Sequence, residues 1–217
     1  MAERRVAQLL RALRGPSTSH DSTTQIPKPS QASGTARHVL VVGATGVVGR
    51  AAVEHFEGLG SWRVTMVSRR PPLFATAAQH IPLDLTDRLA CEAALGSLGG
   101  VTHLVYTALS GVDIAEPAAV VTNTEMLRNT LESLETGASA QTLQHVSLMQ
   151  GRKAYAGADP KLLLWPLKER HPRSEAAEPN WYFTHEDLLI EHHQRQATAW
   201  TYTIWRPPTV LCDFPLI

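Results

Sequence analysis

The segment that decides the fold reads Val39-Leu40-Val41-Val42-Gly43-Ala44-Thr45-Gly46-Val47-Val48-Gly49. Its four leading residues are apolar and mostly β-branched, which is typical of a strand buried on both faces of a parallel sheet. A G-x-x-G-x-x-G loop follows and opens a predicted helix over residues 47–59. In this setting Gly43 allows the tight turn, Gly46 lets the main chain approach a pyrophosphate, and Gly49 lets the helix pack closely on the sheet. We therefore predict a dinucleotide site with contacts from Gly43, Thr45, Gly46, Val47, Val48 and Gly49.

Strand and helix patterns alternate along the rest of the chain. Strands are predicted over residues 39–42, 62–67, 81–83, 101–106, 144–149 and 200–205, and helices over 47–59, 87–98, 117–136 and 184–196. Strands separated by helices form βαβ units, which wind right-handedly into a parallel sheet. The expected fold is an α/β, Rossmann-type, doubly wound parallel sheet with helices on both faces, formed as one domain by residues 38–217.

Residues 1–37 are expected to form a flexible tail. Its first fourteen residues fit a short amphipathic helix, and the remainder is rich in Ser, Thr, Pro and Gln. An Arg-rich, acid-poor start followed by hydroxyl residues also resembles a mitochondrial transit peptide. We expect a cytoplasmic protein with a plain tail, and a mitochondrial location is the alternative.

Composition excludes several classes of partner. The chain has 20 basic and 20 acidic side chains, so it lacks the basic field that nucleic-acid binding requires. No apolar stretch approaches the roughly 20 residues that span a bilayer. Cys91 and Cys212 form no C-x-x-C pair, which indicates a reducing compartment. His185 and His192 are seven residues apart rather than four, so we expect no metal site.

The end of the second strand indicates which dinucleotide is bound. The chain has Ser68-Arg69-Arg70 where NAD enzymes usually carry an acidic residue, and two guanidinium groups favour a 2′-phosphate. NADPH is therefore the expected cofactor, and a solvated basic loop is the alternative. Asp84-Leu85 is expected to flank the adenine, or Asp84 to cap the following helix. The remaining predicted cofactor contacts are Tyr106, Thr107, Ser147 and Lys153.

The usual acid–base pair of short-chain reductases is absent. That pair is a tyrosine followed four residues later by a lysine, which lowers the pKa of the phenol. Here Tyr155 is followed at this spacing by Asp159, and Tyr182 by Glu186. An active protein must therefore take its acid and its cation from different segments.

Two other motifs carry a family resemblance. Gly151-Arg152-Lys153-Ala154-Tyr155 follows the fifth predicted strand, and Asn180-Trp181-Tyr182-Phe183-Thr184-His185-Glu186-Asp187 opens the last helix. Both resemble motifs of the progesterone 5β-reductase and iridoid synthase family of atypical short-chain reductases, T-G-x-K-H-Y and N-F-Y-Y-x-x-E-D. The resemblance covers nearly everything after the tail. It implies NADPH-dependent reduction of the C=C bond of an enone or enal, an α,β-unsaturated carbonyl of specialised metabolism.

The resemblance also implies two catalytic residues. The family's catalytic tyrosine falls on Tyr182, which would donate a hydrogen bond to the substrate carbonyl oxygen. Its catalytic lysine falls on Lys153, which would supply positive charge and hold the nicotinamide ribose. These roles suit an enolate that forms after hydride transfer and needs stabilisation.

The chain departs from the family pattern at several positions. Gln150 stands for the first threonine of the lysine motif, Ala154 for its histidine and Phe183 for the second tyrosine of the other motif. Pro208 stands for the glycine of an R-P-G turn. Family members continue well past the position of Ile217, so we expect the C-terminal substrate segment to be missing. The exposed edges of a shortened sheet make a homodimer one possible assembly.

Two other functions stay open at this point. One is a non-catalytic NADP(H)-binding sensor, or a truncated inactive homologue. The other is carbonyl reduction or isomerisation of a small metabolite on the same scaffold, because one fold supports many chemistries.

Overall fold

The computed structural model describes residues 37–111, 115–156, 161, 165–173, 179–195 and 200–212. The predicted amphipathic helix and all of the tail before Arg37 lie outside the described residues. The strands are β1 (Arg37–Val42), β2 (Trp62–Ser68), β3 (Gln79–Pro82), β4 (His103–Tyr106), β5 (His145–Met149) and β6 (Thr201–Trp205). The helices are α2 (Val47–Gly58), α3 (Arg88–Gly96), α4 (Pro117–Thr136), α5 (Lys153–Ala156) and α6 (Trp181–Arg195).

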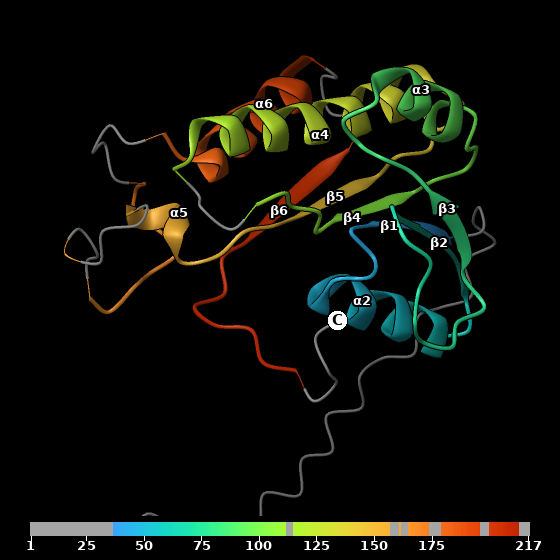
Figure 1. Ribbon diagram of the computed structural model, residues 1–217, viewed down its shortest axis with the longest axis horizontal. Helices are drawn as coiled ribbons and strands as arrows, with labels where there is room; N and C mark the ends of the chain where they lie inside the picture. The colour runs from blue at the N-terminus through green and yellow to red at the C-terminus, as the bar shows by residue number, and fades with distance from the viewer. Residues whose placement is uncertain are drawn as a thin grey trace, which may run out of the picture. The chain divides into compact units, whose positions relative to one another are not determined.

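The six strands form one sheet in the order β3-β2-β1-β4-β5-β6 (Figure 1). Every pair of neighbouring strands is parallel. The chain moves outward from β1 through β2 to β3, then returns past β1 to β4, so the strand order reverses between β1 and β4. In open α/β sheets, ligands bind at such a switch point, outside the carboxyl ends of the strands. The predicted Rossmann-type fold is confirmed.

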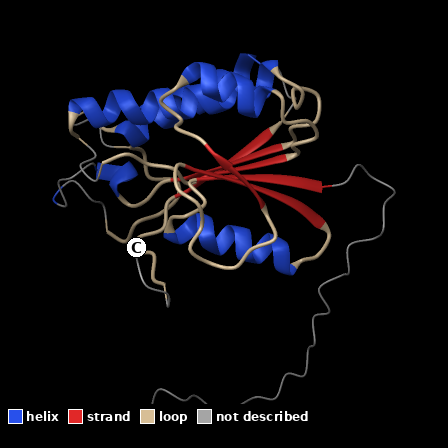
Figure 2. Ribbon diagram, turned by 45° about the vertical axis from the view of Figure 1, so that its right-hand side comes forward, coloured by secondary structure: helices blue, strands red, loops and turns tan. Residues whose placement is uncertain are grey.

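The two faces of the sheet are covered unequally (Figures 1 and 2). Helix α2 packs on one face, and helices α3, α4 and α6 pack on the other. Val39 and Val41 of β1 lie in the cluster under α2, whereas Leu40 and Val42 lie in the larger cluster under the three helices. Alternate residues of a strand point to opposite faces. The all-apolar run at the start of the domain is therefore buried on both sides, as predicted.

Several element boundaries differ from the sequence prediction by one to three residues. Helix α6 begins at Trp181, three residues before the predicted start, because the Asn180 side chain caps it by accepting the Tyr182 N–H at 3.0 Å. Strand β3 ends at Pro82, and Leu83 leaves the sheet to be buried in the core. The four-residue helix α5 lies in a stretch that was predicted to be irregular. Within the described residues, no helix is long and apolar enough to cross a membrane.

Candidate functional site

The glycine loop is held close beneath the end of β4. Gly43 has a φ of +82°, and a Cβ atom there would lie 2.5 Å from the Ala108 nitrogen. A Cβ atom on Gly49 would lie 2.2 Å from the Gly43 oxygen. Side chains at these two positions would collide with main-chain atoms that cannot move independently. Both glycines are therefore required by packing, as the loop pattern predicted.

Gly46 is different because its open side faces outward. It is exposed, and a Cβ atom there would meet only the Gly43 oxygen, at 3.3 Å. Gly46 is also the N-cap of α2 and provides no side-chain cap, which leaves the first N–H groups of the helix, including those of Val47 and Val48, available to a ligand. A side chain at Gly46 would fill this cradle. The residues present therefore fit a dinucleotide pyrophosphate, which helix N-termini bind through N–H groups and the helix dipole. Thr45 is exposed beside it.

Thr107 fastens the glycine loop to β4. Its hydroxyl donates to the Val42 oxygen at 2.8 Å, and its N–H donates to the same oxygen at 2.8 Å. The neighbouring Tyr106 points the other way. Its side chain is fully buried against the His185 ring, with no partner for the hydroxyl among the described residues, and burial raises the pKa of the phenol. Tyr106 therefore has only its main chain to offer a cofactor in the crevice.

The arginine-bearing loop after β2 is organised by Ser68 and a histidine that sequence reasoning missed. The Ser68 hydroxyl donates to the Arg70 carbonyl at 2.7 Å and lies 2.9 Å from His80 Nε2. Because the hydroxyl hydrogen is used, the His80 N–H must be the donor to Ser68. The side chains of Arg69 and Arg70 are exposed. His80 stands on β3 beside the predicted 2′-phosphate site, and only the strand pairing of β2 with β3 brings it there.

Asp84 forms a local turn rather than a helix cap. Its Oδ1 accepts the Thr86 N–H at 3.0 Å and the Thr86 hydroxyl at 2.8 Å. These two hydrogen bonds, with a contribution from the charge of Arg69, lower the pKa of Asp84. Helix α3 is instead capped by Asp87, which accepts the Ala90 N–H, so the interpretation of Asp84 as the N-cap is wrong. The Leu85 side chain is buried in the core.

The predicted catalytic residues come from separate segments that the fold brings together. Lys153 begins α5 just after β5, and Tyr182 is the second residue of α6. Asn180 joins them, because its Nδ2 donates to the Lys153 carbonyl at 3.1 Å while its Oδ1 accepts the Tyr182 N–H. A Cβ atom on Gly151 would lie 3.4 Å from the Tyr182 hydroxyl, so that hydroxyl rests over the bare Gly151. Burial raises the pKa of the Tyr182 phenol.

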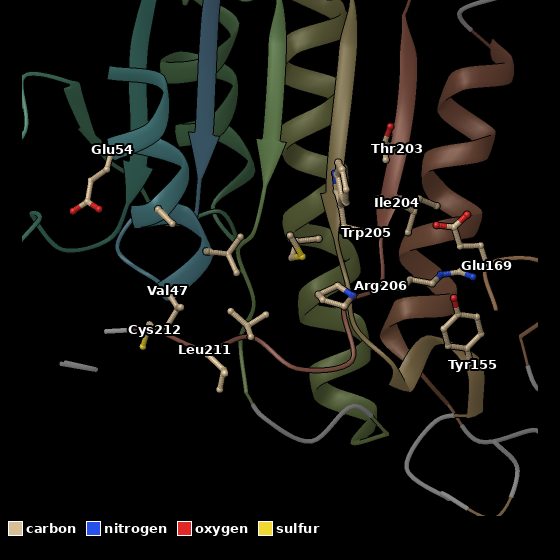
Figure 3. A pocket seen from close by; sticks show the side chains of 15 residues that line it. Val47, Glu54, Tyr155, Glu169, Thr203, Ile204, Trp205, Arg206, Leu211 and Cys212 are labelled. Carbon is tan, nitrogen blue, oxygen red and sulfur yellow. The ribbon is translucent and has the colours of Figure 1, made fainter. Parts of the chain in front are cut away.

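A pocket of 1230 Å³ lies between the start of α2 and the carboxyl ends of β5 and β6 (Figure 3). Val47 borders it on one side, and Tyr155 and Arg206 border it on the other. The Arg206 guanidinium lies 5.2 Å from the centre of the Tyr155 ring and donates to Glu186 Oε2 at 2.8 Å. The full lining is Val47, Val48, Ala51, Glu54, Met149, Tyr155, Glu169, Thr203, Ile204, Trp205, Arg206, Pro207, Val210, Leu211 and Cys212.

Neither of the two predicted catalytic residues, Lys153 and Tyr182, is among the residues that line this pocket. Met149 of β5 lines it, whereas Ser147, two residues earlier on the same face of the strand, is half-buried and is not among the lining residues. Arg206 also lines the pocket, and nothing in its local sequence indicated this place. In the part of the chain that the structure describes, no three His, Cys, Asp or Glu side chains are grouped so that they could hold a metal ion.

Comparison with protein families and relatives points in one direction. The NAD dependent epimerase/dehydratase family model matches residues 39–212. The (S)-8-oxocitronellyl enol synthase of Nepeta racemosa is 33% identical over 187 residues, which cover 79% of this chain and 45% of that protein. That of Camptotheca acuminata is 31% identical with the same coverage. A short chain dehydrogenase of Penicillium aethiopicum is 27% identical, covering 79% of this chain and 46% of its own. The chain thus spans less than half the length of these relatives.

Solved structures share the same fold. A short-chain dehydrogenase/reductase superfamily protein from Agrobacterium tumefaciens with bound NAD has a TM-score of 0.60 at 25% identity, covering 78% of this chain and 48% of that chain. A UDP-glucose 4-epimerase of Thermotoga maritima has a TM-score of 0.63 at 18% identity, covering 78% and 54%.

Proposed function

Since the chain belongs to the NAD dependent epimerase/dehydratase family, we propose that it is an NADPH-dependent oxidoreductase that reduces the C=C bond of an enone or enal in specialised metabolism. The motif resemblance to the progesterone 5β-reductase and iridoid synthase family is confirmed by the relatives. Those relatives are named for making an 8-oxocitronellyl enol. An enol or enolate is what hydride addition to the β-carbon of an enal leaves, so the name supports this reaction class.

One observation carries the proposal. Asn180 hydrogen-bonds to the main chain of both Lys153 and Tyr182, and thereby holds the two predicted catalytic residues at the carboxyl edge of the sheet. The uncapped start of α2 lies at the same edge, because all six strands are parallel. A dinucleotide bound across this edge reaches from Arg69 and Arg70, through the glycine loop, to the segment that bears Lys153 and Tyr182.

The adenosine end would set the choice of cofactor. Arg69 and Arg70 are exposed at the end of β2, next to β1 and its glycine loop, and would pair with the 2′-phosphate that NADPH has and NADH lacks. Ser68 and His80 hold the main chain of this loop in place. The N–H groups at the start of α2 would bind the pyrophosphate.

The nicotinamide end would carry the chemistry. When bound, the reduced nicotinamide supplies a hydride to the β-carbon of the substrate. Tyr182 would then donate a hydrogen bond to the oxygen on which negative charge develops. Because burial raises its pKa, the phenol stays protonated at neutral pH and is able to donate. Lys153 would add positive charge beside this oxygen and hold the ribose.

The pocket suits a largely apolar substrate. Val47, Val48, Met149 and Ile204 contribute aliphatic and thioether surface, and the carboxylates of Glu54 and Glu169 lie among the lining residues. A hydrocarbon chain buried against such a wall gains roughly 25 cal/mol for each Å² of apolar surface removed from water. The carbonyl would then lie at the end of the pocket nearest Pro207, whose own carbonyl is close to Gly151.

The decisive experiment combines cofactor titration with product analysis. NADPH and NADH are titrated by fluorescence, and enals and enones are then added. Tyr182→Phe should leave NADPH binding within about twofold and lower turnover by about 100-fold or more, because general-acid groups contribute on that scale. Tyr202→Phe on β6 is the matched control and should change neither.

The products separate the proposal from its rivals. A saturated aldehyde or ketone supports the reductase. An alcohol with the alkene intact identifies a carbonyl reductase, and a shifted double bond identifies an isomerase. Tight NADPH binding without turnover identifies a sensor, and NADH binding that equals NADPH binding contradicts the cofactor assignment.

A further inference from the structure

Two buried amide side chains surround the main chain of Tyr182. The carboxamide of Asn180 accepts the Tyr182 N–H through Oδ1, at 3.0 Å. From the other side, Gln150 Nε2 donates to the Tyr182 carbonyl at 2.8 Å. Asn180 is 4% exposed and Gln150 is 5% exposed. Both peptide groups that flank the Tyr182 Cα atom are therefore hydrogen-bonded by side chains that water scarcely reaches.

The same two residues reach the segment that carries Lys153. Asn180 Nδ2 donates to the Lys153 carbonyl at 3.1 Å, across 27 positions of sequence. Gln150 lies three residues before Lys153, at the end of β5, where its own N–H donates to the Trp205 carbonyl at 2.8 Å. The β5–α5 segment, the start of α6 and the end of β6 are thus tied together around Asn180 and Gln150.

Neither contact is needed to form the helices themselves. An N-cap requires only an acceptor for an N–H of the first turn, and Ser, Thr or Asp would serve at position 180 as well as Asn. The extra N–H of the Asn180 amide is used to reach Lys153 instead. Likewise, the Tyr182 carbonyl is approached by Gln150 at a position where the resembled family has threonine, whose side chain is too short to make the same contact.

From these contacts we infer that Asn180 and Gln150 act as a two-amide clamp, positioning residues that hold Tyr182 and Lys153 in one fixed arrangement. The inference rests on the proposed function for its catalytic meaning, but the clamp itself is a property of the folded chain. Because a misplacement of about 1 Å can cost about 100-fold in rate, a clamp of this kind matters more to turnover than to stability.

The test uses variants that keep the helix cap and lose the bridge. Asn180→Asp and Asn180→Ser both retain an acceptor for the Tyr182 N–H, and neither has the amide N–H that reaches Lys153. Gln194→Glu is the matched control, because it makes the same amide-to-carboxylate change at an exposed position of the same helix. All variants are made in the full chain and compared by thermal unfolding, amide hydrogen exchange and steady-state turnover.

Hydrogen exchange is the first readout and needs neither cofactor nor substrate. In α5 the N–H groups of Ala154 and Tyr155 donate to Gly151 and Arg152. Loss of the Asn180 bridge should speed their exchange about fivefold, the factor expected for one hydrogen bond, in both variants and not in the control. Unchanged exchange in both Asn180 variants would overturn the clamp.

Turnover is the second readout. Both Asn180 variants should lower kcat by about 10- to 100-fold, with the KM for the enal within about threefold, because binding is retained and alignment is lost. Gln150→Met should act in the same direction, and its combination with Asn180→Ser should cost less than the product of the two single effects. Independent, multiplicative effects would mean two separate contacts rather than a clamp. If the unmodified chain reduces no enal, the proposed function fails while the exchange result still decides the clamp.

Discussion

The two ends of the candidate site are built in different ways. At the adenosine end the binding groups come from short runs of consecutive residues, the glycine loop and Ser68-Arg69-Arg70, each following directly from one strand. At the nicotinamide end, single side chains that follow β5 and β6 meet the first turns of α6 through hydrogen bonds, such as that from Gln150 to the Tyr182 carbonyl. The first end uses main-chain geometry and exposed charge, and the second uses buried side-chain contacts.

This difference shows where each end is vulnerable. The glycine loop tolerates no added atom at Gly43 or Gly49, because these two glycines lie against main-chain atoms. The nicotinamide end has instead a set of polar contacts whose loss should misplace Tyr182 without unfolding the domain. Backbone substitutions should therefore affect the first end through folding, and polar substitutions should affect the second through alignment. Substitutions at the two ends test this contrast.

The largest effect is expected at Gly49. Gly49→Ala places a methyl group 2.2 Å from the Gly43 oxygen, so the loop and helix must separate, at a cost of more than about 3 kcal/mol. Thermal unfolding should show a midpoint lowered by about 10 °C, together with lost NADPH binding. Gly58→Ala, where a Cβ atom meets nothing within 4 Å, is the control and should be neutral or slightly stabilising. A stable Gly49→Ala protein that binds NADPH would contradict the close packing of this loop.

Acid should loosen the scaffold behind the nicotinamide end. His185 of α6 is buried against Tyr106 and Trp181, and desolvation lowers its pKa from 6.5 to about 4. A buried neutral histidine contributes stability that is fully present above pH 6.5 and is lost as the pH falls toward 4. The expected loss is about 2 kcal/mol by pH 5, and about 3 kcal/mol near pH 4.

Urea unfolding at pH 7 and pH 5 checks this titration. His185→Gln should be less stable at pH 7, because the Asn123 carbonyl loses its hydrogen bond from His185 Nε2. The same variant should lose less stability than the unmodified protein on acidification. His38, whose pKa burial also lowers, contributes to the slope in both proteins. Parallel pH profiles for the two proteins would rule out His185 as the main titrating group.

Cofactor selectivity should depend on the exposed arginines alone. Replacing Arg69 and Arg70 together by alanine should raise the NADPH dissociation constant about 10- to 100-fold and leave that of NADH nearly unchanged, because only NADPH has the 2′-phosphate. Arg63→Ala removes an exposed arginine from the opposite end of the same strand and serves as the control. An equal loss of affinity for NADPH and NADH would show that Arg69 and Arg70 stabilise the loop rather than bind the 2′-phosphate.

The smallest effects are expected from two neighbouring acids of α6. Glu186 pairs with Arg206 at 2.8 Å with both side chains under 20% exposed, whereas Asp187 pairs with Arg173 at 2.7 Å with side chains 58% and 39% exposed. Glu186→Gln should cost about 1–2 kcal/mol, because it leaves a partly buried guanidinium unpaired, and Asp187→Asn less than about 1 kcal/mol. A larger loss of thermal stability in Asp187→Asn than in Glu186→Gln would mean that burial does not determine how much these ion pairs stabilise the fold.

Sequence reasoning was most successful where a signal is local. The strand, glycine loop and helix of residues 39–59 were predicted with their order and approximate bounds, because apolar periodicity and glycine placement act within a few residues. It was less successful at the start of α6, where the cap at Asn180 was missed among aromatic residues. Tyr106 was assigned to the cofactor, yet its side chain belongs to the core, because alternate residues of β4 face opposite sides of the sheet.

The sequence by itself determined the fold class, the glycine-loop cradle and the exposed arginines, since each depends on the identity and spacing of neighbouring residues. Only the tertiary structure decided that His80 supports Ser68, that Arg206 borders the pocket, and that Asn180 and Gln150 enclose Tyr182. The contacts of Ser68 with His80 and of Gln150 with Tyr182 join residues that are 12 and 32 positions apart. Their existence depends on strand order, register and helix packing, which no short stretch of sequence specifies.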